Sequence, residues 1–280
     1  MDSAEVRAGW NNIQLEAENS VVEKGYSHLN IVYHGTLGQG HYTAYFLPMN
    51  YDEQKKYPTL VWLNGLNQVD PSVFLEHDYF ERMRIELSDY IIIVPSFRGQ
   101  ALVYRNKKYC SDGFFGDAYD GAATDGLRAL NLGKKLYPID ESRIAVAGQS
   151  RGGTVALLMA ARDSMIRTVV DITGPVDFYD KRSYYRYGKQ FKYQFLSQSK
   201  NLKTIRHKMI ASSPIYFLED YKHPILIVYG KSDRVVPIEN AEKLILKLKG
   251  RDYFEAKLLN RGHDIRATKI IFDWLKIHNN

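Results

Sequence analysis

One serine in this sequence stands between a stretch typical of a buried strand and a stretch typical of a helix. The apolar run Arg143–Ala147 leads into Gly148-Gln149-Ser150-Arg151-Gly152-Gly153, and small helix-compatible residues follow from Thr154 to Ala160. Glycine fits where a strand turns sharply into a helix, because it has no Cβ and tolerates strained backbone angles. This order of strand, turn and helix indicates a nucleophile elbow, a turn that holds a serine hydroxyl clear of the sheet.

The five-residue pattern alone is weak evidence for an elbow. Gly and Ser each make up about 7% of residues, so the pattern arises by chance in roughly one chain in ten of this length. The strand pattern before it and the helix pattern after it make the elbow the favoured interpretation.

The composition is that of a globular protein. The 280 residues are 45% hydrophobic and 25% charged, and they suffice for one large domain or two small ones. No stretch reaches 18 apolar residues, so no membrane span is expected. The N-terminal residues have no apolar signal core. Two locations are therefore compatible with the sequence: the cytoplasm, or the periplasm or exterior if a signal peptide has been removed. Cys110 is the only cysteine, which excludes an intrachain disulfide.

The net charge of +6 is concentrated in one segment. Tyr179–Lys208 holds nine lysines and arginines against a single acid, Asp180, whereas elsewhere the two signs alternate as on a solvated surface. No recognised nucleic-acid-binding module accompanies this basic segment, so nucleic acid is not an expected partner.

Strand and helix patterns alternate along most of the chain. Apolar runs typical of strands occur eight times, and Gly35–Gly40 reads as a hairpin loop between the first two. Alternation of strand and helix from Thr59 onwards predicts a mostly parallel eight-stranded sheet with helices on both faces, as one domain over residues 1–280. The strands are expected at His28–Tyr33, Thr43–Leu47, Thr59–Leu63, Tyr90–Pro95, Arg143–Ala147, Thr168–Ile172, Pro224–Tyr229 and Phe254–Leu259.

Helices are expected after Asp70-Pro71 as far as Leu87, over about Asp117–Leu136, and after Ser150, Ile238 and His263. The last of these carries one apolar stripe at helical spacing, formed by Ile270, Ile271, Trp274 and Leu275.

A segment at about residues 174–222 interrupts this alternation and is rich in tyrosine and basic residues. One interpretation is a cap-like insertion over the ligand crevice at the carboxyl ends of the strands. The other is a solvated helical decoration whose tyrosines pack on the body of the domain.

A serine hydroxyl needs a base, and the base needs a group that orients it. In a sheet with an elbow, the acid and then the histidine follow the serine along the chain, each in a loop after a strand. Asp233 follows the strand Pro224–Tyr229, and His263 lies between the last strand and the last helix. We therefore predict the catalytic triad Ser150, Asp233 and His263. Asp264 is a rival for the acid, but as the neighbour of His263 in sequence it is badly placed to orient the ring.

The developing negative charge on a substrate oxygen needs two backbone N–H donors. One is expected from Arg151, directly after the serine. The other is expected from the loop Leu63–Asn67, with Leu66 preferred and Asn67 as the alternative.

These stretches together resemble the α/β-hydrolases, and specifically the catalytic domain of the prolyl oligopeptidase family. The resemblance covers about residues 58–278. It rests on the elbow, Gly230–Pro237, Gly262-His263, Val94–Gly99, Asp117–Ala122 and Tyr137–Ala145. Two features depart from that family: Arg151 stands where an aromatic residue usually follows the nucleophile, and the residues before Thr59 leave no room for a β-propeller.

The resemblance implies an α/β-hydrolase fold and a serine hydrolase that forms an acyl-enzyme without metal or organic cofactor. Peptide specificity does not carry over with the propeller missing, so a small carboxylic ester is the favoured substrate and a short peptide the alternative. An acyltransferase or a catalytically silent binding module is a weaker reading. Tyr184, Tyr185, Tyr187 and Arg98 are candidate substrate-binding residues.

Overall fold

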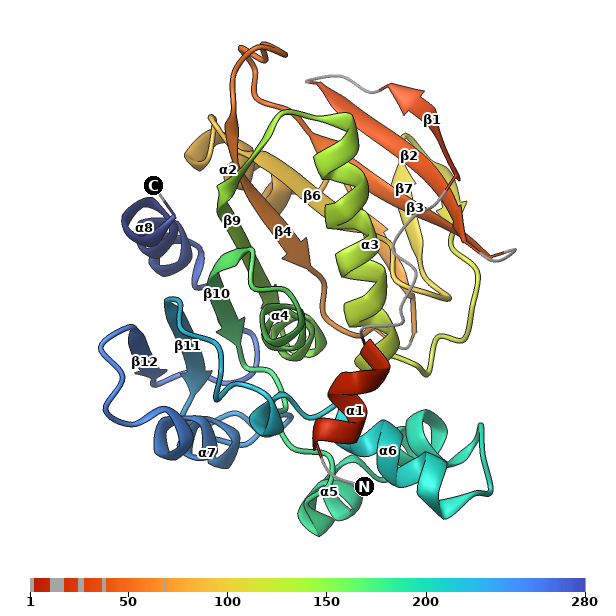
Figure 1. Ribbon diagram of the computed structural model, residues 1–280, viewed down its shortest axis with the longest axis vertical. Helices are drawn as coiled ribbons and strands as arrows, with labels where there is room; N and C mark the ends of the chain where they lie inside the picture. Colours follow the sequence, from red (N-terminus) through yellow and green to blue (C-terminus); the bar gives the residue numbers. More distant parts are fainter. Residues whose placement is uncertain (1–2, 11–17, 25–27, 37–38, 68, 280) are drawn as a thin grey trace.

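The computed structural model describes residues 3–10, 18–24, 28–36, 39–67 and 69–279. Within them, one nine-stranded sheet has the order β1-β2-β3-β6-β4-β9-β10-β11-β12 (Figure 1). Its strands are β1 (Glu18–Lys24), β2 (Leu29–Thr36), β3 (Gln39–Phe46), β4 (Tyr57–Leu63), β6 (Ile91–Pro95), β9 (Ile139–Gln149), β10 (Ile166–Ile172), β11 (Ile225–Gly230) and β12 (Phe254–Leu259).

The sheet is parallel from β6 to β12 and antiparallel from β1 to β6. All eight predicted strands are present, and β2 and β3 form the expected hairpin, with Thr36 opposite Gln39. The hairpin residues Leu37 and Gly38 lie outside the described residues.

The ninth strand, β1, was not predicted. It reads Glu-Asn-Ser-Val-Val-Glu-Lys, with Val21 and Val22 both exposed. An edge strand with a polar sequence has no alternating apolar pattern, so only its pairing with β2 reveals it.

Side chains of the central strands point alternately to two hydrophobic clusters, one on each face of the sheet. In β4, Val61 and Leu63 belong to one cluster, and Leu60 and Trp62 to the other. The first cluster packs under α3 (Asp120–Leu136), α4 (Arg151–Arg162) and α7 (Glu239–Leu248). The second packs under α2 (Asp78–Glu86) and α8 (Thr268–His278). The fold is therefore a three-layer α/β structure, as the alternation of patterns predicts.

The helix expected directly after Pro71 begins later, at Asp78. The residues between them contain the short strand β5 (Ser72–Phe74), which pairs with β7 (Ala101–Tyr104). A further strand, β8 (Lys107–Cys110), completes a small three-stranded sheet against the second cluster. Strands of three or four residues carry too little periodicity to be predicted, and this small sheet was missed.

The segment between β10 and β11 is helical. It contains α5 (Lys181–Phe191), a π-helical turn (Lys192–Leu196), α6 (Leu202–Ala211) and a 3₁₀ turn (Pro214–Tyr216), and α1 (Ser3–Trp10) lies beside α6 (Figure 1). Phe178, Phe191 and Phe195 pack together and belong to the first cluster. The assignment of residues 1–280 to a single domain stays a prediction. No helix in the described part of the chain is long and apolar enough to cross a membrane.

One buried carboxyl group lies beneath the elbow. Asp171 in β10 is fully buried, and it accepts hydrogen bonds from the Tyr229 hydroxyl at 2.7 Å and from the Gly174 N–H at 2.8 Å. Burial raises the pKa of Asp171 to about 7, and these two hydrogen bonds only partly oppose that rise.

This raised pKa predicts a pH-dependent stability. An unfolded Asp ionises near pH 4, so between pH 4 and pH 7 the folded state holds a proton that the unfolded state has lost. The contribution of Asp171 to the free energy of unfolding is therefore greatest below pH 4 and is lost as the pH rises through 7. We expect Asp171→Asn to gain stability relative to wild type by on the order of 2 kcal/mol between pH 5 and pH 8.

Urea unfolding at the two pH values measures this difference, with Asp252→Asn at an exposed position as the matched control. An equal pH dependence in wild type and Asp171→Asn would contradict the assignment.

Candidate active site

Ser150 occupies a strained turn between a strand and a helix. Strand β9 ends at Gln149 and α4 begins at Arg151. The backbone of Ser150 has φ 55° and ψ −120°, a conformation that side chains other than glycine rarely adopt. The Ser150 N–H donates to the carbonyl of Ile172 at 2.7 Å, which ties the turn to β10. The backbone geometry is that expected of a nucleophile elbow.

The glycines around Ser150 are required by close packing. A Cβ on Gly152 would overlap the carbonyl oxygen of Leu63 at the end of β4, and a Cβ on Gly148 would overlap Gly152 itself. Helix α4 can therefore begin against the end of β4 only because both positions lack a side chain.

The predicted acid and base meet Ser150 from two loops. Asp233 follows β11, and His263 follows β12. The Nδ1 of His263 lies 2.7 Å from Asp233 Oδ2, and its Nε2 lies 3.0 Å from Ser150 Oγ. The rival acid, Asp264, is exposed. The structure thus brings together the three residues predicted from the sequence and leaves Asp264 out of this chain of hydrogen bonds.

Asp233 is held as an anion. Its other carboxylate oxygen, Oδ1, accepts from the N–H groups of Val235 at 2.7 Å and Val236 at 2.9 Å. Burial alone would raise the pKa of Asp233, but the hydrogen bonds from His263 and from these two N–H groups outweigh it and lower the pKa. An ionised Asp233 can accept from Nδ1–H of His263, which leaves Nε2 free to take a proton from Ser150.

Two backbone N–H groups near Ser150 are available to an oxyanion. Arg151 is the first residue of α4, where backbone N–H groups have no partner within the helix. Leu66 is half-buried in the loop after β4. Among the described residues, no hydrogen bond uses the N–H of Leu66 or of Arg151. Their role as the oxyanion hole stays a prediction.

The side chain of Arg151 packs into the protein against the loop after β4, a role that the sequence did not indicate. Although it follows the serine, its guanidinium is buried and stacks 4.7 Å from the ring of Phe97. It donates to the carbonyl of Asn64 at 3.2 Å, to that of Gly65 at 2.8 Å and to Gln100 Oε1 at 2.8 Å. Arg151 therefore fixes the backbone of the loop that contains Leu66. Burial lowers its pKa to about 9.

The tyrosines proposed for substrate binding are divided by the structure. Tyr185 and Tyr187 line a cleft of about 380 Å³ between α5 and α7, whereas Tyr184 packs edge-on against Phe191 and does not line it. We call this the α5–α7 cleft. Its lining does not include Ser150 or His263, and it contains five charged side chains: Asp180, Arg182, Arg186, Glu239 and Lys243.

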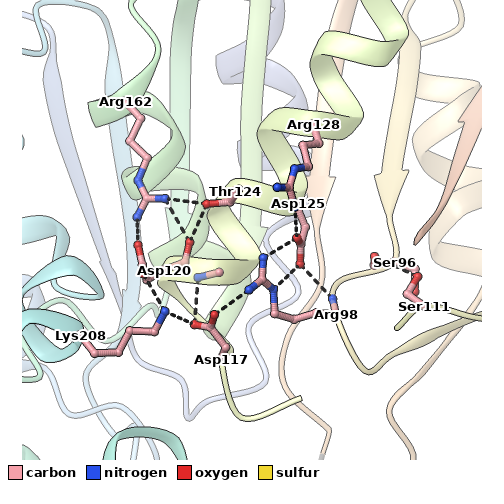
Figure 2. Close-up of polar contacts among 11 residues, drawn as sticks. Ser96, Arg98, Ser111, Asp117, Asp120, Thr124, Asp125, Arg128, Arg162 and Lys208 are labelled. Carbon is pink, nitrogen blue, oxygen red and sulfur yellow. Dashed lines mark hydrogen bonds and ion pairs between the residues drawn. The ribbon is translucent and has the colours of Figure 1, made fainter. Parts of the chain in front are cut away.

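The structure places Arg98 in a buried ion-pair network (Figure 2). It binds Asp125 through Nε and Nη2, and Asp117 through Nη1 at 2.7 Å. Asp117 also binds Lys208 of α6, as does Asp120. The guanidinium is thus bound by two carboxylates. Arg98 does not line the α5–α7 cleft, nor the cleft between β5 and α2 that is described next. We do not include Arg98 in the proposed substrate site.

A second cleft is lined by Gln149, the residue before Ser150, although Ser150 and His263 are not among its lining residues either. It has a volume of about 240 Å³ and lies between the loop after β4, strand β5 and the start of α2, and we call it the β5–α2 cleft. Gln149 and Gly65 both line it, and a Cβ on Gly65 would lie 3.8 Å from Ser150 Cβ. Its remaining lining residues are Trp62, Asn64, Asn67, Ser72, Val73, Phe74, His77, Tyr79, Phe80 and Gln100.

No group of three or more His, Cys, Asp or Glu side chains able to hold a metal ion exists in the part of the chain that the structure describes. The expectation that catalysis needs no metal or organic cofactor stays a prediction.

Parts of the sequence match known protein families and one curated relative. Residues 36–170 match the family named Esterase, and residues 125–248 match the family named BD-FAE. A curated relative, "Uncharacterized peptidase YuxL" of Bacillus subtilis (strain 168), is 23% identical over 237 residues, which are 79% of this chain. The chain spans only about a third of the length of that relative, 33%.

Several solved structures share the fold. An acetyl xylan esterase from Paenibacillus sp. R4 has a TM-score of 0.70 and 18% identity, with 98% of this chain and 92% of that chain covered. Acetyl xylan esterase 1 from Thermoanaerobacterium sp. JW/SL YS485 has a TM-score of 0.68 and 15% identity, with 98% and 93% covered. A puromycin-hydrolyzing peptidase of Mycobacterium tuberculosis has a TM-score of 0.64 and 17% identity, with 93% and 38% covered.

The sheet order, the strained serine turn and these similarities together show that the chain has the α/β-hydrolase fold and that parts of its sequence are similar to hydrolases of the esterase and peptidase families.

Proposed function

We propose that this protein is a serine hydrolase that cleaves small carboxylic esters through an acyl-enzyme. The observation that carries the proposal is the unbroken hydrogen-bond chain from Asp233 through His263 to Ser150 Oγ, at 2.7 and 3.0 Å. Nε2 of His263 takes the hydroxyl proton as Ser150 Oγ attacks the ester carbonyl carbon. The N–H groups of Leu66 and Arg151 then stabilise the negative oxygen of the tetrahedral intermediate.

The proton returns from His263 to the leaving alcohol, and the acyl group stays on Ser150. A water molecule, activated by the same imidazole, then releases the carboxylic acid and restores the free serine. An acyltransferase would follow the same steps with another alcohol in place of water. Product analysis in the presence of an added alcohol distinguishes the two.

The charges of the insertion support an ester rather than a peptide substrate. A peptidase that trims short peptides usually needs free acids to hold the peptide amino group. Here Asp177 and Asp180 both bind Lys243, at 2.6 and 2.8 Å, and Asp180 also binds Arg182. These acids are therefore neutralised within the protein. A prolyl-oligopeptidase-like peptidase acting on short peptides remains the second candidate, favoured by the similarity to YuxL.

Replacing the nucleophile should abolish turnover. We expect Ser150→Ala to lower kcat on a small aryl ester by on the order of a million-fold, because the hydroxyl that attacks the ester carbonyl carbon is lost. Ser88→Ala, on the exposed surface, is the matched control and should retain wild-type rates. Turnover near the wild-type rate in purified Ser150→Ala protein would exclude the mechanism, and it would also exclude catalytic use of the elbow.

Replacing the acid tests its assignment against its neighbour. We expect Asp233→Asn to lower kcat by about ten-thousand-fold, because an amide favours the imidazole tautomer that cannot accept the serine proton. Asp264→Asn carries the same change one residue beyond His263 and should have little effect on kcat. If the two variants exchange these outcomes, Asp264 is the acid.

Matched esters and amides test the substrate class. We expect kcat/KM for p-nitrophenyl acetate to exceed that for p-nitroacetanilide by at least about a hundred-fold, because an amine leaving group depends more strongly on protonation by His263. Aminoacyl and prolyl p-nitroanilides form the third arm. Efficient cleavage of one of these amides, at a rate comparable to the ester, would replace the esterase proposal with the peptidase.

A further inference from the structure

Arg151 is a buried arginine whose guanidinium forms no ion pair in the described part of the chain. Arg162, at the other end of the same helix, shows the usual arrangement, because its guanidinium is paired with Asp120 at 2.7 Å. The acceptors of Arg151 are all uncharged: the carbonyl oxygens of Asn64 and Gly65 and one side-chain amide oxygen. Burying an unpaired charge costs free energy, and an apolar side chain would avoid that cost. Stability alone therefore does not account for an arginine at this position.

The carbonyl groups that Arg151 binds belong to the peptide units that lead into Leu66. A peptide unit is planar and trans, so the C=O of Gly65 and the N–H of Leu66 lie in one plane and point in opposite directions. Arg151 Nη2 donates to the Gly65 oxygen at 2.8 Å. This hydrogen bond consequently fixes the direction of the Leu66 N–H, the group proposed to bind the oxyanion.

Gly65 would otherwise allow this peptide unit to rotate. Glycine adopts a wide range of backbone angles because it has no Cβ. A Cβ on Gly65 would lie 3.5 Å from the Gln149 carbonyl oxygen and 3.8 Å from Ser150 Cβ, which are ordinary contacts, so the surroundings leave room for rotation. Arg151 opposes it with a second anchor, because its Nε and Nη2 both donate to the carbonyl of Asn64 at 3.2 Å. The planar guanidinium thus holds two successive peptide units in a fixed relative orientation.

The charge of Arg151 acts on the same peptide unit. A cation bound to a carbonyl oxygen polarises the peptide group and makes its N–H a stronger donor. Although burial lowers the pKa of Arg151 to about 9, the guanidinium is still charged at pH 7. The ring of Phe97 at 4.7 Å and the Gln100 Oε1 at 2.8 Å hold it in place. Because the oxyanion forms only during the reaction, this polarisation lowers the barrier without strengthening the binding of the ester.

We propose that the Arg151 side chain is a positioning residue for ester hydrolysis, which orients and polarises the Gly65–Leu66 peptide unit so that the Leu66 N–H stabilises the oxyanion. This role is separate from that of the Arg151 backbone N–H, which every substitution of the side chain leaves in place. The inference rests on the proposed function, because it needs a serine that attacks an ester.

Two substitutions of Arg151 test this role by kinetics on p-nitrophenyl acetate. Arg151→Met removes the charge and the hydrogen bonds, and we expect it to lower kcat about a hundred-fold, the loss typical of one oxyanion donor, while KM changes by less than about threefold. Arg151→Lys keeps the charge and a donor, so it should lose only about tenfold. A kcat for folded Arg151→Met within about threefold of wild type would overturn the proposal.

Arg162→Met is the matched control, because it makes the same substitution at a buried arginine of the same helix outside the site (Figure 2). It deprives Asp120 of one cation and should lower the melting temperature. Its kcat, assayed well below that temperature, should stay within about twofold of wild type. A hundred-fold loss of kcat in Arg162→Met as well would show that any disturbance of α4 has this effect, and the proposal would fail.

A transition-state analogue reports on the oxyanion directly. Ser150 Oγ adds to the ketone carbon of 1,1,1-trifluoro-4-phenylbutan-2-one, the serine proton passes to His263 Nε2, and the ketone oxygen becomes a bound oxyanion. We expect Arg151→Met to raise its Ki by about the same factor of a hundred. The matched methyl ketone, 4-phenylbutan-2-one, is not activated toward addition, so its Ki should not change. Equal effects on the two ketones would contradict the positioning role.

A measurement without turnover separates this inference from the proposed function. In Ser150→Ala protein, adding Arg151→Met should speed hydrogen–deuterium exchange in peptides that cover Asn64–Asn67 and leave exchange in β11 unchanged. If wild-type protein shows Ser150-dependent hydrolysis but Arg151→Met alters neither kcat nor this exchange, only the positioning role fails. If exchange becomes faster but wild-type protein hydrolyses no ester, the proposed function fails and the hold of Arg151 on the loop stands.

Discussion

The contact between the serine turn and the end of β4 is the constraint on which the rest of this site depends. Without side chains at Gly148 and Gly152, the start of α4 lies directly against Leu63. This proximity allows the Arg151 side chain to reach the carbonyls of Asn64 and Gly65. Burying a guanidinium costs free energy unless its N–H groups are hydrogen-bonded. Here the carbonyls of Asn64 and Gly65 and the side chain of Gln100 accept its hydrogen bonds, and the ring of Phe97 stacks on it. The turn that carries the nucleophile and the loop opposite it are consequently joined by direct hydrogen bonds.

Much of this arrangement follows from local sequence signals. The eight predicted strands contain apolar runs, so their pattern predicts them, and the order of Ser150, Asp233 and His263 along the chain follows from the direction of a parallel sheet. In such a sheet the loops at the carboxyl ends of neighbouring strands meet at one edge. This geometry places Ser150, Asp233 and His263 at the same edge of the sheet, although Ser150 and His263 are 113 positions apart in the chain.

The features that the sequence did not reveal depend on long-range contacts. Strand β1 is polar and is defined only by its pairing with β2, and each residue pair between β5 and β7 is separated by 28 intervening positions. The Arg151 side chain is buried because it donates to carbonyl groups 86 and 87 residues earlier in the chain. The local sequence around Ser150 does not reveal these acceptors. Arg98 was predicted to bind substrate, because its two carboxylate partners, Asp117 and Asp125, are brought to it only by folding.

The ion-pair network of Figure 2 also has a consequence for how ligands enter and leave. Lys208 of α6 binds both Asp117 and Asp120, and Arg162 of α4 binds Asp120 from the other side. Moving α6 away from the body would break both ion pairs of Lys208 and leave Asp117 paired only with Arg98 and Asp120 only with Arg162, so such a motion costs free energy. Helix α6 of the insertion is therefore attached to the body of the protein by the ion pairs of Lys208. Product departure should accordingly be governed by fast side-chain and loop fluctuations rather than by the slow opening of a lid.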